Sequence, residues 1–228
     1  MILSFSNSSL SLPEGFTATA HSGCEGTKDN SFEFLKKCIQ INAQVAEIDV
    51  TFRRDGTPVI IHKDLAENGE GILFDEAMKF LSENTDKMRF NLDLKAFSRI
   101  DAVIDIIEKY SLSKRCFFTG VELEQAKMLK NQRIKIPYYL NKSFSPLKKH
   151  SKRFLECLAD EVKQCGAVGI NCNYSFASKE MVEIFRENGL LTSFWTANSE
   201  KVMKRLLLLA PDNITTRYPV LLESLICK

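Results

Sequence analysis

The sequence predicts a (β/α)8 TIM barrel with an added antiparallel hairpin arm after its second strand. Short apolar runs alternate with helical patterns along almost all of the 228-residue chain, as expected of parallel strands joined by crossover helices. The pair Asp55-Gly56 separates two apolar runs and is a strong hairpin signal. Once this arm is set aside, eight of nine candidate strands remain, and eight strands close such a barrel.

The candidate strands are short apolar runs, whereas the candidate helices place apolar residues three and four apart. In the helix predicted over 99–110, for example, isoleucine and valine recur at helical spacing. The predicted strands are 17–21, 45–51, 58–62, 88–94, 116–119, 136–140, 167–171, 191–196 and 213–216. The predicted helices are 31–43, 74–83, 99–110, 121–131, 151–165, 178–188, 199–210 and 219–226.

The arm follows from the short spacing between the second and third candidate strands. Parallel neighbours need a crossover of a dozen or more residues, so these two strands must run antiparallel. With a two-residue turn at Asp55-Gly56, Asp49 lies directly opposite His62 and on the same face. The same register places Glu47 opposite Asp64, and a longer loop would shift it.

An open, doubly wound sheet is the alternative fold. It is disfavoured because the chain has no Gly-rich turn of the G-x-G-x-x-G type after a strand. No domain boundary stands out, so we expect a single domain over residues 1–228.

Composition and charge are ordinary for a soluble globular protein, and the charge balance argues neither for nor against a charged partner. The hydrophobic content is 44%, and 31 basic residues balance 29 acidic ones to a net charge of +2. The basic run at 148–153 is interpreted as a solvated helix start rather than a nucleic-acid or membrane patch. We expect no nucleic-acid partner, and the sequence indicates no particular oligomeric state.

A reducing, cytoplasmic location is expected from the cysteines. The seven cysteines are scattered without a C-x-x-C motif, which is typical of free thiols. We identify no signal peptide and no apolar run of the roughly 20 residues that span a bilayer. Cys24 lies close to His21, so a nucleophilic Cys–His pair is an alternative chemistry, although no orienting partner is evident.

Three acidic side chains fall near the carboxyl ends of candidate strands, where such barrels have their active sites. Glu47 and Asp49 share one face of their strand, and Asp93 lies on another strand. Like charges about 4 Å apart repel by roughly 4 kcal/mol at an effective dielectric near 20, so a cation or a proton must neutralise them. Oxygen ligands suit one divalent cation, Mg²⁺ or Ca²⁺. Alternatively, Glu47 and Asp49 lie on the outer face of an amphipathic strand, although helices should cover that face.

Two of the three histidines, His21 and His62, fall at the same predicted mouth. Because imidazoles titrate near neutral pH, one can accept a proton while the other donates one. Lys95 is two residues from Asp93 and would neutralise phosphoryl oxygens, or else it is a surface lysine paired with Asp93. Trp195 either forms a flat wall for a ligand or fills the core. These groups together favour a phosphodiester substrate.

The motifs, in chain order, are His21-x-Gly23, Asn30-Ser31, Glu47-x-Asp49, Asp55-Gly56, Val59 to His62, Asp93-Leu94-Lys95, Trp195-Thr196-x-Asn198 and Thr215-x-x-x-Pro219. This order resembles the glycerophosphodiester phosphodiesterase family over essentially the whole chain. The resemblance implies a (β/α)8 barrel that binds a divalent cation and produces glycerol 3-phosphate and a free alcohol. It also implies that Glu47, Asp49 and Asp93 are the metal ligands.

By the same resemblance, His21 and His62 match the acid–base pair, and Lys95 matches the phosphate-neutralising lysine. The family usually has an arginine directly after the first histidine to contact the phosphate, where this chain has Ser22. Ser22 thus stands at a substrate-binding position, and Arg217 or Arg54 could contact the phosphate from another direction.

Two further functions stay open. Ser22 favours a non-catalytic relative that binds phosphorylated ligands. The run Asp93-Leu94-Lys95 also resembles the sphingomyelinase D-like enzymes, which form a cyclic phosphate by attack of an internal hydroxyl. The segment between His62 and Asp93 is short for the family that the chain resembles, which often carries a small insertion there. By this resemblance we expect an open mouth and a bulky alcohol, so a lysophospholipid is a candidate substrate besides a small phosphodiester.

Overall fold

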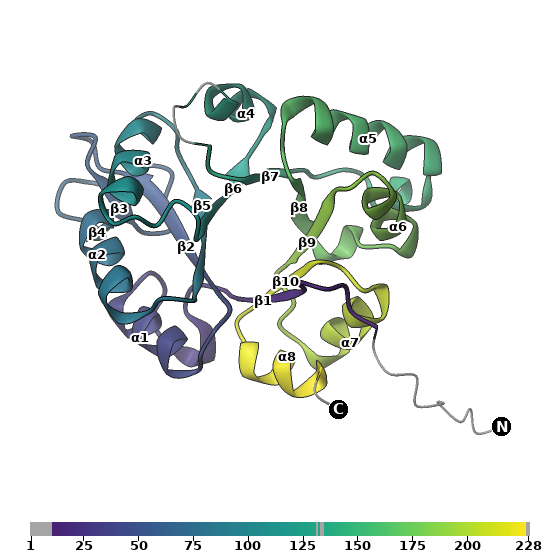
Figure 1. Ribbon diagram of the computed structural model, residues 1–228, viewed down its shortest axis with the longest axis horizontal. Helices are drawn as coiled ribbons and strands as arrows, with labels where there is room; N and C mark the ends of the chain where they lie inside the picture. Colours follow the sequence, from purple (N-terminus) through teal and green to yellow (C-terminus); the bar gives the residue numbers. More distant parts are fainter. Residues whose placement is uncertain (1–10, 131, 133–134, 227–228) are drawn as a thin grey trace.

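A closed ring of parallel strands, wrapped by helices, forms the molecule in the computed structural model (Figure 1). The structure describes residues 11–130, 132 and 135–226. The strand β1 (Thr17–Ala20) pairs in parallel with β10 (Asn213–Thr216) on one side and with β2 (Val45–Phe52) on the other, which closes the ring. The predicted (β/α)8 barrel is therefore confirmed.

The elements follow one another as strand and helix around the ring, and most lie within two or three residues of their predicted bounds. The other barrel strands are β5 (Arg89–Leu94), β6 (Cys116–Val121), β7 (Tyr138–Asn141), β8 (Gly169–Asn173) and β9 (Leu191–Trp195). The α-helices are α1 (Phe32–Gln40), α2 (Phe74–Asn84), α3 (Ile100–Lys109), α4 (Leu123–Lys130), α5 (Lys152–Cys165), α6 (Lys179–Glu187), α7 (Glu200–Leu209) and α8 (Pro219–Ile226). Short 3-10 turns are η1 (Cys24–Gly26), η2 (Pro146–His150) and η3 (Tyr174–Phe176).

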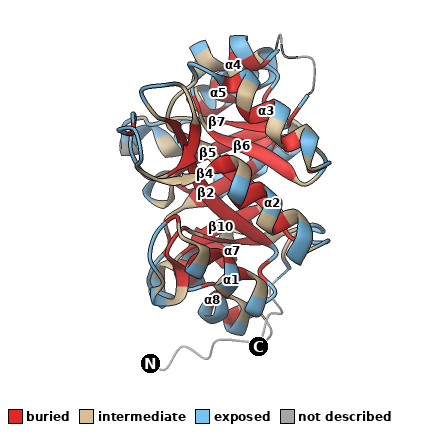
Figure 2. Ribbon diagram, turned by 90° about the vertical axis from the view of Figure 1, so that its left-hand side faces the viewer, coloured by how far each residue is buried: buried red, intermediate tan, exposed pale blue. Residues whose placement is uncertain are grey.

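Serine residues start three of the helices. The Oγ atoms of Ser31, Ser178 and Ser199 accept hydrogen bonds from backbone amides in the first turns of α1, α6 and α7. Each helix then turns its apolar stripe toward the sheet, so buried residues concentrate on the strands and on the inner helix faces (Figure 2). No helix among the described residues is long and apolar enough to cross a membrane.

The arm consists of β3 (Pro58–Ile60), which pairs antiparallel with β2, and the two-residue strand β4 (Ile72–Leu73), which the sequence did not predict. The predicted register is wrong by one residue, because Phe52 pairs with Pro58. The loop has three residues rather than two, since Arg53 N donates to Thr57 O and Gly56 takes a φ of 86°.

With this register, Asp49 lies opposite Ile61 and not opposite His62; the amide of Ile61 donates to Asp49 O at 3.2 Å. Asp64 is likewise not opposite Glu47, and Asp64 O accepts from Thr51 Oγ1 instead. The strand β3 stops at Ile60, two residues before the predicted end.

A bulge at Gly120 lengthens β6 to Val121, where the sequence predicted the start of a helix. Gly120 has a φ of 74°, and a Cβ atom there would lie 2.3 Å from Leu94 O. Only glycine allows β6 to approach β5 this closely in that conformation. Residue 131, the end of the helix predicted over 121–131, and Cys227 lie outside the described residues.

A chain of hydrogen-bonded polar side chains runs through the barrel interior. Thr19 Oγ1 donates to Asn213 Oδ1 at 2.7 Å, and Asn213 Nδ2 donates to Ser193 Oγ at 2.9 Å. Ser193 Oγ donates to Asn171 Oδ1 at 2.8 Å, and Asn171 Nδ2 donates to Asn141 Oδ1 at 3.2 Å. Strands of a parallel barrel are usually almost entirely apolar. Polar residues are tolerated at these positions because the buried polar groups satisfy one another.

Candidate active site

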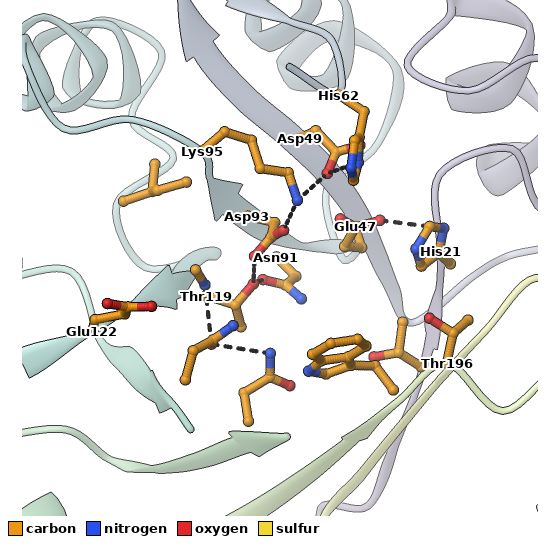
Figure 3. Close-up of a pocket in the computed structure, with 16 residues that line it drawn as sticks. His21, Glu47, Asp49, His62, Asn91, Asp93, Lys95, Thr119, Glu122 and Thr196 are labelled. Atoms are coloured by element: carbon orange, nitrogen blue, oxygen red, sulfur yellow. Dashed lines mark hydrogen bonds and ion pairs between the residues drawn. The ribbon is translucent and has the colours of Figure 1, made fainter. Parts of the chain in front are cut away.

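A cavity of about 320 Å³ opens at the carboxyl ends of the barrel strands. It is lined by His21, Glu47, Asp49, His62, Asn91, Asp93, Leu94, Lys95, Thr119, Gly120, Glu122, Asn141, Asn171, Trp195, Thr196 and Thr215. Glu47, Asp49 and Asp93 each offer a carboxylate oxygen, and these oxygens lie within 4.8 Å of one another (Figure 3). The structure thus brings together the three side chains that the sequence proposed as metal ligands.

Asp49 is 2% exposed and is held by partners from three segments. Its Oδ2 accepts from Asn30 Nδ2 at 2.7 Å, while its own amide donates to Asn30 Oδ1 at 3.0 Å. Its Oδ1 lies 2.8 Å from Lys95 Nζ and 3.2 Å from His62 Nδ1. Burial alone would raise the pKa of Asp49, but the Lys95 ammonium and the Asn30 hydrogen bond outweigh it and lower that pKa.

Glu47 is also buried in the same strand, and no residue among those described forms a cationic contact with it as close as that of Lys95 with Asp49. Its Oε2 accepts from the Ser22 amide at 2.9 Å and lies 3.8 Å from His21 Nδ1. Burial raises the pKa of Glu47 well above its usual value, and the charges of Asp49 and Asp93 raise it further. A positive charge at the cluster would therefore stabilise ionised Glu47.

Lys95 bridges two of the carboxylates (Figure 3). Its ammonium contacts Asp93 Oδ2 as well as Asp49 Oδ1. Burial opposes the charge, but the attraction of Asp93 and Asp49 raises the pKa of Lys95. Thr119 Oγ1 lies 2.8 Å from Asp93 Oδ1 and fixes the orientation of that carboxylate. Lys95 is thus a partly buried member of the cluster rather than a surface lysine.

Each of the two histidines approaches one carboxylate of the cluster. His21 follows β1, and its Nδ1 lies 2.9 Å from Ser22 O. Burial lowers the pKa of His21, so its neutral form is favoured near neutral pH. His62 reaches Asp49 from the loop that follows β3, although it is not part of that strand. The prediction that both imidazoles face one mouth agrees with this geometry, even though the register behind it was wrong.

Trp195 ends β9 and lines the cavity. Its Nε1 is buried and has no hydrogen-bond partner among the described residues. Buried donors in folded proteins are nearly always paired, so this N–H is available to a bound molecule. Of the two roles considered from the sequence, the ligand wall fits the cavity.

Ser22 and Arg217, proposed from the sequence to contact substrate, do not line the cavity. Ser22 is fully buried, and its Oγ accepts from the Asn30 amide at 2.7 Å. The Arg217 guanidinium pairs with both oxygens of Asp29, at 2.7 and 3.0 Å. A Cβ at Gly23 would lie 1.9 Å from Asp29 Oδ1, so the pair packs tightly on the turn after β1. Both side chains are therefore engaged within the protein.

The Cys–His alternative is not supported by the geometry. Cys24 is fully buried, and its Sγ lies 4.0 Å from Cys38 Sγ. A nucleophilic thiol has to reach the substrate, and Cys24 is not among the lining residues.

Several lining residues were missed from the sequence. Asn91, Thr119, Asn141 and Asn171 are polar lining residues, together called the polar floor, and Glu122 is an exposed lining residue. The sequence signal that could have identified these residues is a single amide or hydroxyl side chain near the carboxyl end of an apolar strand. Asn30 was noted in a motif, but nothing in the sequence indicates that it holds Asp49.

Comparison with known proteins places this barrel among the hydrolases of phosphoric diesters. The protein-family model described as "Glycerophosphoryl diester phosphodiesterase family" matches residues 65–221 of the sequence, which is more than half of the chain. The chain belongs to this family, and the resemblance seen in the sequence is confirmed.

Similar proteins agree with this assignment. A curated glycerophosphodiester phosphodiesterase of Caldanaerobacter subterraneus subsp. tengcongensis is 24% identical over 238 residues, which cover 92% of this chain and 97% of the relative. A solved structure from Silicibacter pomeroyi DSS-3, described as a protein of this kind, has a TM-score of 0.80 at 17% identity and covers 93% of each chain. A phosphodiesterase of Oleispira antarctica, solved with the product sn-glycerol 3-phosphate, has a TM-score of 0.73 at 21% identity and covers 95% of this chain and 98% of that one.

Proposed function

We propose that this protein hydrolyses glycerophosphodiesters to glycerol 3-phosphate and a free alcohol, with one divalent cation and two histidines. The observation that carries the proposal is the convergence of three carboxylates, an ammonium and two imidazoles on one cavity. Phosphoryl transfer requires stabilisation of charge on the phosphoryl oxygens and proton transfer at the attacking and leaving oxygens. This set of groups contains a candidate for each task.

The donor set fits Mg²⁺ or Ca²⁺. Glu47, Asp49 and Asp93 supply only oxygen atoms, which hard cations prefer. Three ionised carboxylates and the Lys95 ammonium sum to −3 + 1 = −2, the charge that one divalent cation balances. When bound, the cation would polarise a phosphoryl oxygen as a Lewis acid. The raised pKa of Glu47 supports this assignment, because buried like charges require such compensation.

The remaining groups would act on the phosphodiester itself. Lys95 is near enough to the carboxylates to share their cavity, and its ammonium would neutralise a second phosphoryl oxygen. One imidazole, of His21 or His62, would take a proton from the attacking water. The other would give a proton to the leaving alcohol. Each transfer typically contributes about 10² to 10⁴ in rate.

The polar floor fits the glycerol end of the substrate. Trp195, Asn141 and Asn171 are neutral polar residues that line the cavity, and Trp195 Nε1–H has no partner among the described residues. A glycerol hydroxyl would accept a hydrogen bond from Trp195 Nε1, while the alcohol would extend outward through the mouth. A bulky alcohol, such as that of a lysophospholipid, would then lie outside the barrel. The free cysteines support a reducing, cytoplasmic location.

Phosphorus NMR of the reaction tests the proposal against the two alternatives. We expect purified protein with Mg²⁺ or Ca²⁺ to convert a glycerophosphodiester to glycerol 3-phosphate. A cyclic phosphate as product would instead support intramolecular transfer. Binding of glycerol 3-phosphate without turnover would support the non-catalytic relative.

Histidine variants provide the matched test of the acid–base pair. We expect His21→Ala and His62→Ala each to lower kcat by about 10² or more. The control is His150→Ala, because His150 is exposed and pairs with Glu180 outside the cavity. If all three variants turned over at the same rate, His21 and His62 would have no role in catalysis.

A further inference from the structure

An exposed apolar side chain stands on the rim of the mouth. Leu147, in the η2 turn between β7 and α5, is 90% exposed. Single exposed apolar side chains are common on protein surfaces, so the position of Leu147 and the charges around it decide what it indicates. Crossover segments that follow a barrel strand lie at the same end as the active site, so Leu147 shares the face of the cavity.

The turn is anchored on an aromatic base. The ring of Phe144 lies 4.5 Å from that of Phe176 and 5.2 Å from that of Phe154, measured between centroids. Phe144 is thus packed against the protein, whereas Leu147, three residues later, is left in solvent. Leu147 is therefore presented outward by a held turn.

Positive charge surrounds Leu147. The segment from Lys142 to Arg153 has five lysines and arginines and no carboxylate: Lys142, Lys148, Lys149, Lys152 and Arg153. Lys148 Nζ lies 5.1 Å from the centroid of the Phe154 ring, and Lys149 Nζ donates to Ser175 O at 3.1 Å. These two partners are neutral groups, and neither ammonium has a carboxylate partner among the residues that the structure describes.

The nearby carboxylates pair with other members of the segment. Glu161 contacts Lys142 at 2.9 Å, Glu156 lies 3.8 Å from Lys152, and Glu180 contacts His150 at 3.1 Å. Because the whole chain has a net charge of only +2, the positive charge at η2 is a local feature. Leu147 with Lys148 and Lys149 is called the η2 patch below.

Other points of the same face also expose apolar side chains. Leu65 is exposed in the arm, and Tyr218 and Val220 are exposed just after β10. The arm, α5 and α8 occupy separate positions around the ring (Figure 1). The mouth of the barrel is therefore flanked by apolar groups on several sides.

We propose that the η2 patch docks the protein on an anionic lipid surface, with Leu147 entering the interface and Lys148 and Lys149 facing the headgroup phosphates. A lipid interface accommodates apolar and basic side chains together. A nucleic acid would neutralise the lysines but offers no comparable environment for an exposed leucine. The basic run at 148–153 is interpreted from the sequence as the start of a helix. The helix α5 does start at Lys152, but Leu147, Lys148 and Lys149 lie before it, in the η2 turn. In this orientation the cavity faces the membrane, where a lysophospholipid would present its phosphodiester.

Vesicle co-sedimentation of the full chain tests the docking. The vesicles are phosphatidylcholine alone or phosphatidylcholine with about one third phosphatidylglycerol. We expect at least ~5-fold stronger partitioning to the anionic vesicles, and a loss of this preference at high salt. Leu147→Ser should lower partitioning by ~10-fold, as should the double variant Lys148→Glu/Lys149→Glu.

Leu208→Ser is the matched control. Leu208 is 76% exposed, but it lies near the end of α7, at the opposite end of the barrel. We expect its partitioning to stay within ~2-fold of wild type. The docking does not depend on catalysis, and all variants should hydrolyse a soluble glycerophosphodiester at the wild-type rate. Loss of that activity in the wild type would count against the proposed function alone.

Three results would overturn the docking proposal. The first is wild-type protein that does not distinguish anionic from neutral vesicles. The second is a Leu208→Ser variant that loses as much partitioning as Leu147→Ser. The third is binding of RNA or DNA that requires Lys148 and Lys149, together with vesicle binding that Leu147→Ser leaves unchanged.

Discussion

At the scale of single residues, Asp49 depends on partners that compensate its buried charge. Lys95 is the cation closest to its Oδ1, at 2.8 Å, and both side chains are largely buried. Removal of one partner from a buried ion pair leaves the other charge uncompensated in a low-dielectric environment. The consequences of such a change should appear in stability as well as in activity.

Lys95→Met is predicted to lower the free energy of unfolding by about 3 kcal/mol and kcat by at least about 10². The control is Lys142→Met, which breaks a more exposed pair with Glu161 and should cost no more than about 1 kcal/mol. Urea denaturation and initial-rate kinetics measure the two effects. Equal stability losses in the two variants would contradict the assignment of Lys95 to the buried cluster.

Asn30 positions Asp49 through two hydrogen bonds and has a φ of 48°. Asn30→Gly keeps the left-handed backbone accessible but removes the carboxamide. We predict that cation affinity falls by about 10-fold or more, because ligand orientation is lost. Asn42→Gly is the control, since Asn42 is exposed and has a φ of 51° away from the site. Calorimetric titration with Mn²⁺ measures the affinity for the cation. If Asn30→Gly and Asn42→Gly both bound Mn²⁺ as tightly as the wild type, the role of Asn30 would be structural alone.

His21 should make stability depend on pH. Burial lowers its pKa in the folded protein, so the unfolded chain binds more protons below the ordinary value of 6.5. The contribution of His21 to the free energy of unfolding is therefore complete above pH 6.5. It is lost as the pH falls, by at most about 1.4 kcal/mol per pH unit. The raised pKa of Glu47 has the opposite effect on the pH dependence of stability. Because a variant at position 21 keeps Glu47, this effect is the same in the wild type and in the variant.

We therefore predict that His21→Asn reduces the loss of unfolding free energy between about pH 7 and pH 5.5. Urea denaturation with a chelator present measures this difference without a bound cation. An unchanged or steeper loss in the variant would show that His21 binds protons more readily in the folded state than burial allows.

At the scale of elements, the close approach of β6 to β5 shapes one wall of the cavity. Gly120 and Gly189 have similar positive φ angles of 74° and 70°, but only Gly120 is crowded. Gly189→Ala should cost about 1 kcal/mol from backbone strain alone. Gly120→Ala should cost about 2 to 4 kcal/mol and reduce activity, because its Cβ would meet Leu94 O. Thermal and urea unfolding measure the loss of stability in the two variants. Equal losses would exclude a clash between the new Cβ at position 120 and Leu94 O.

The elements themselves were largely predictable, because each depends on a local pattern. The strand 213–216 and the helix 219–226 have their predicted bounds. The hairpin register was not predictable from Asp55-Gly56, since the loop length depends on backbone conformation around Gly56. Two adjacent strands with an Asp-Gly turn are consistent with both loop lengths.

At the scale of the whole molecule, ring closure assembles the site from segments far apart in sequence. The carboxylates and histidines were identifiable because each lies near the carboxyl end of a strand, and the fold gathers those ends. The engagement of Arg217 was not identifiable, since its partner Asp29 is 188 residues away. The polar floor was missed for the same reason, because its hydrogen bonds join different strands.

The central claim is that Glu47, Asp49 and Asp93 hold one divalent cation. Its most direct test is a crystal soaked with Mn²⁺ as a stand-in for Mg²⁺ or Ca²⁺, measured for anomalous scattering. We predict one strong peak about 2.0 to 2.5 Å from a carboxylate oxygen of each of the three residues. A peak elsewhere, or none between these side chains at saturating Mn²⁺, would contradict the account.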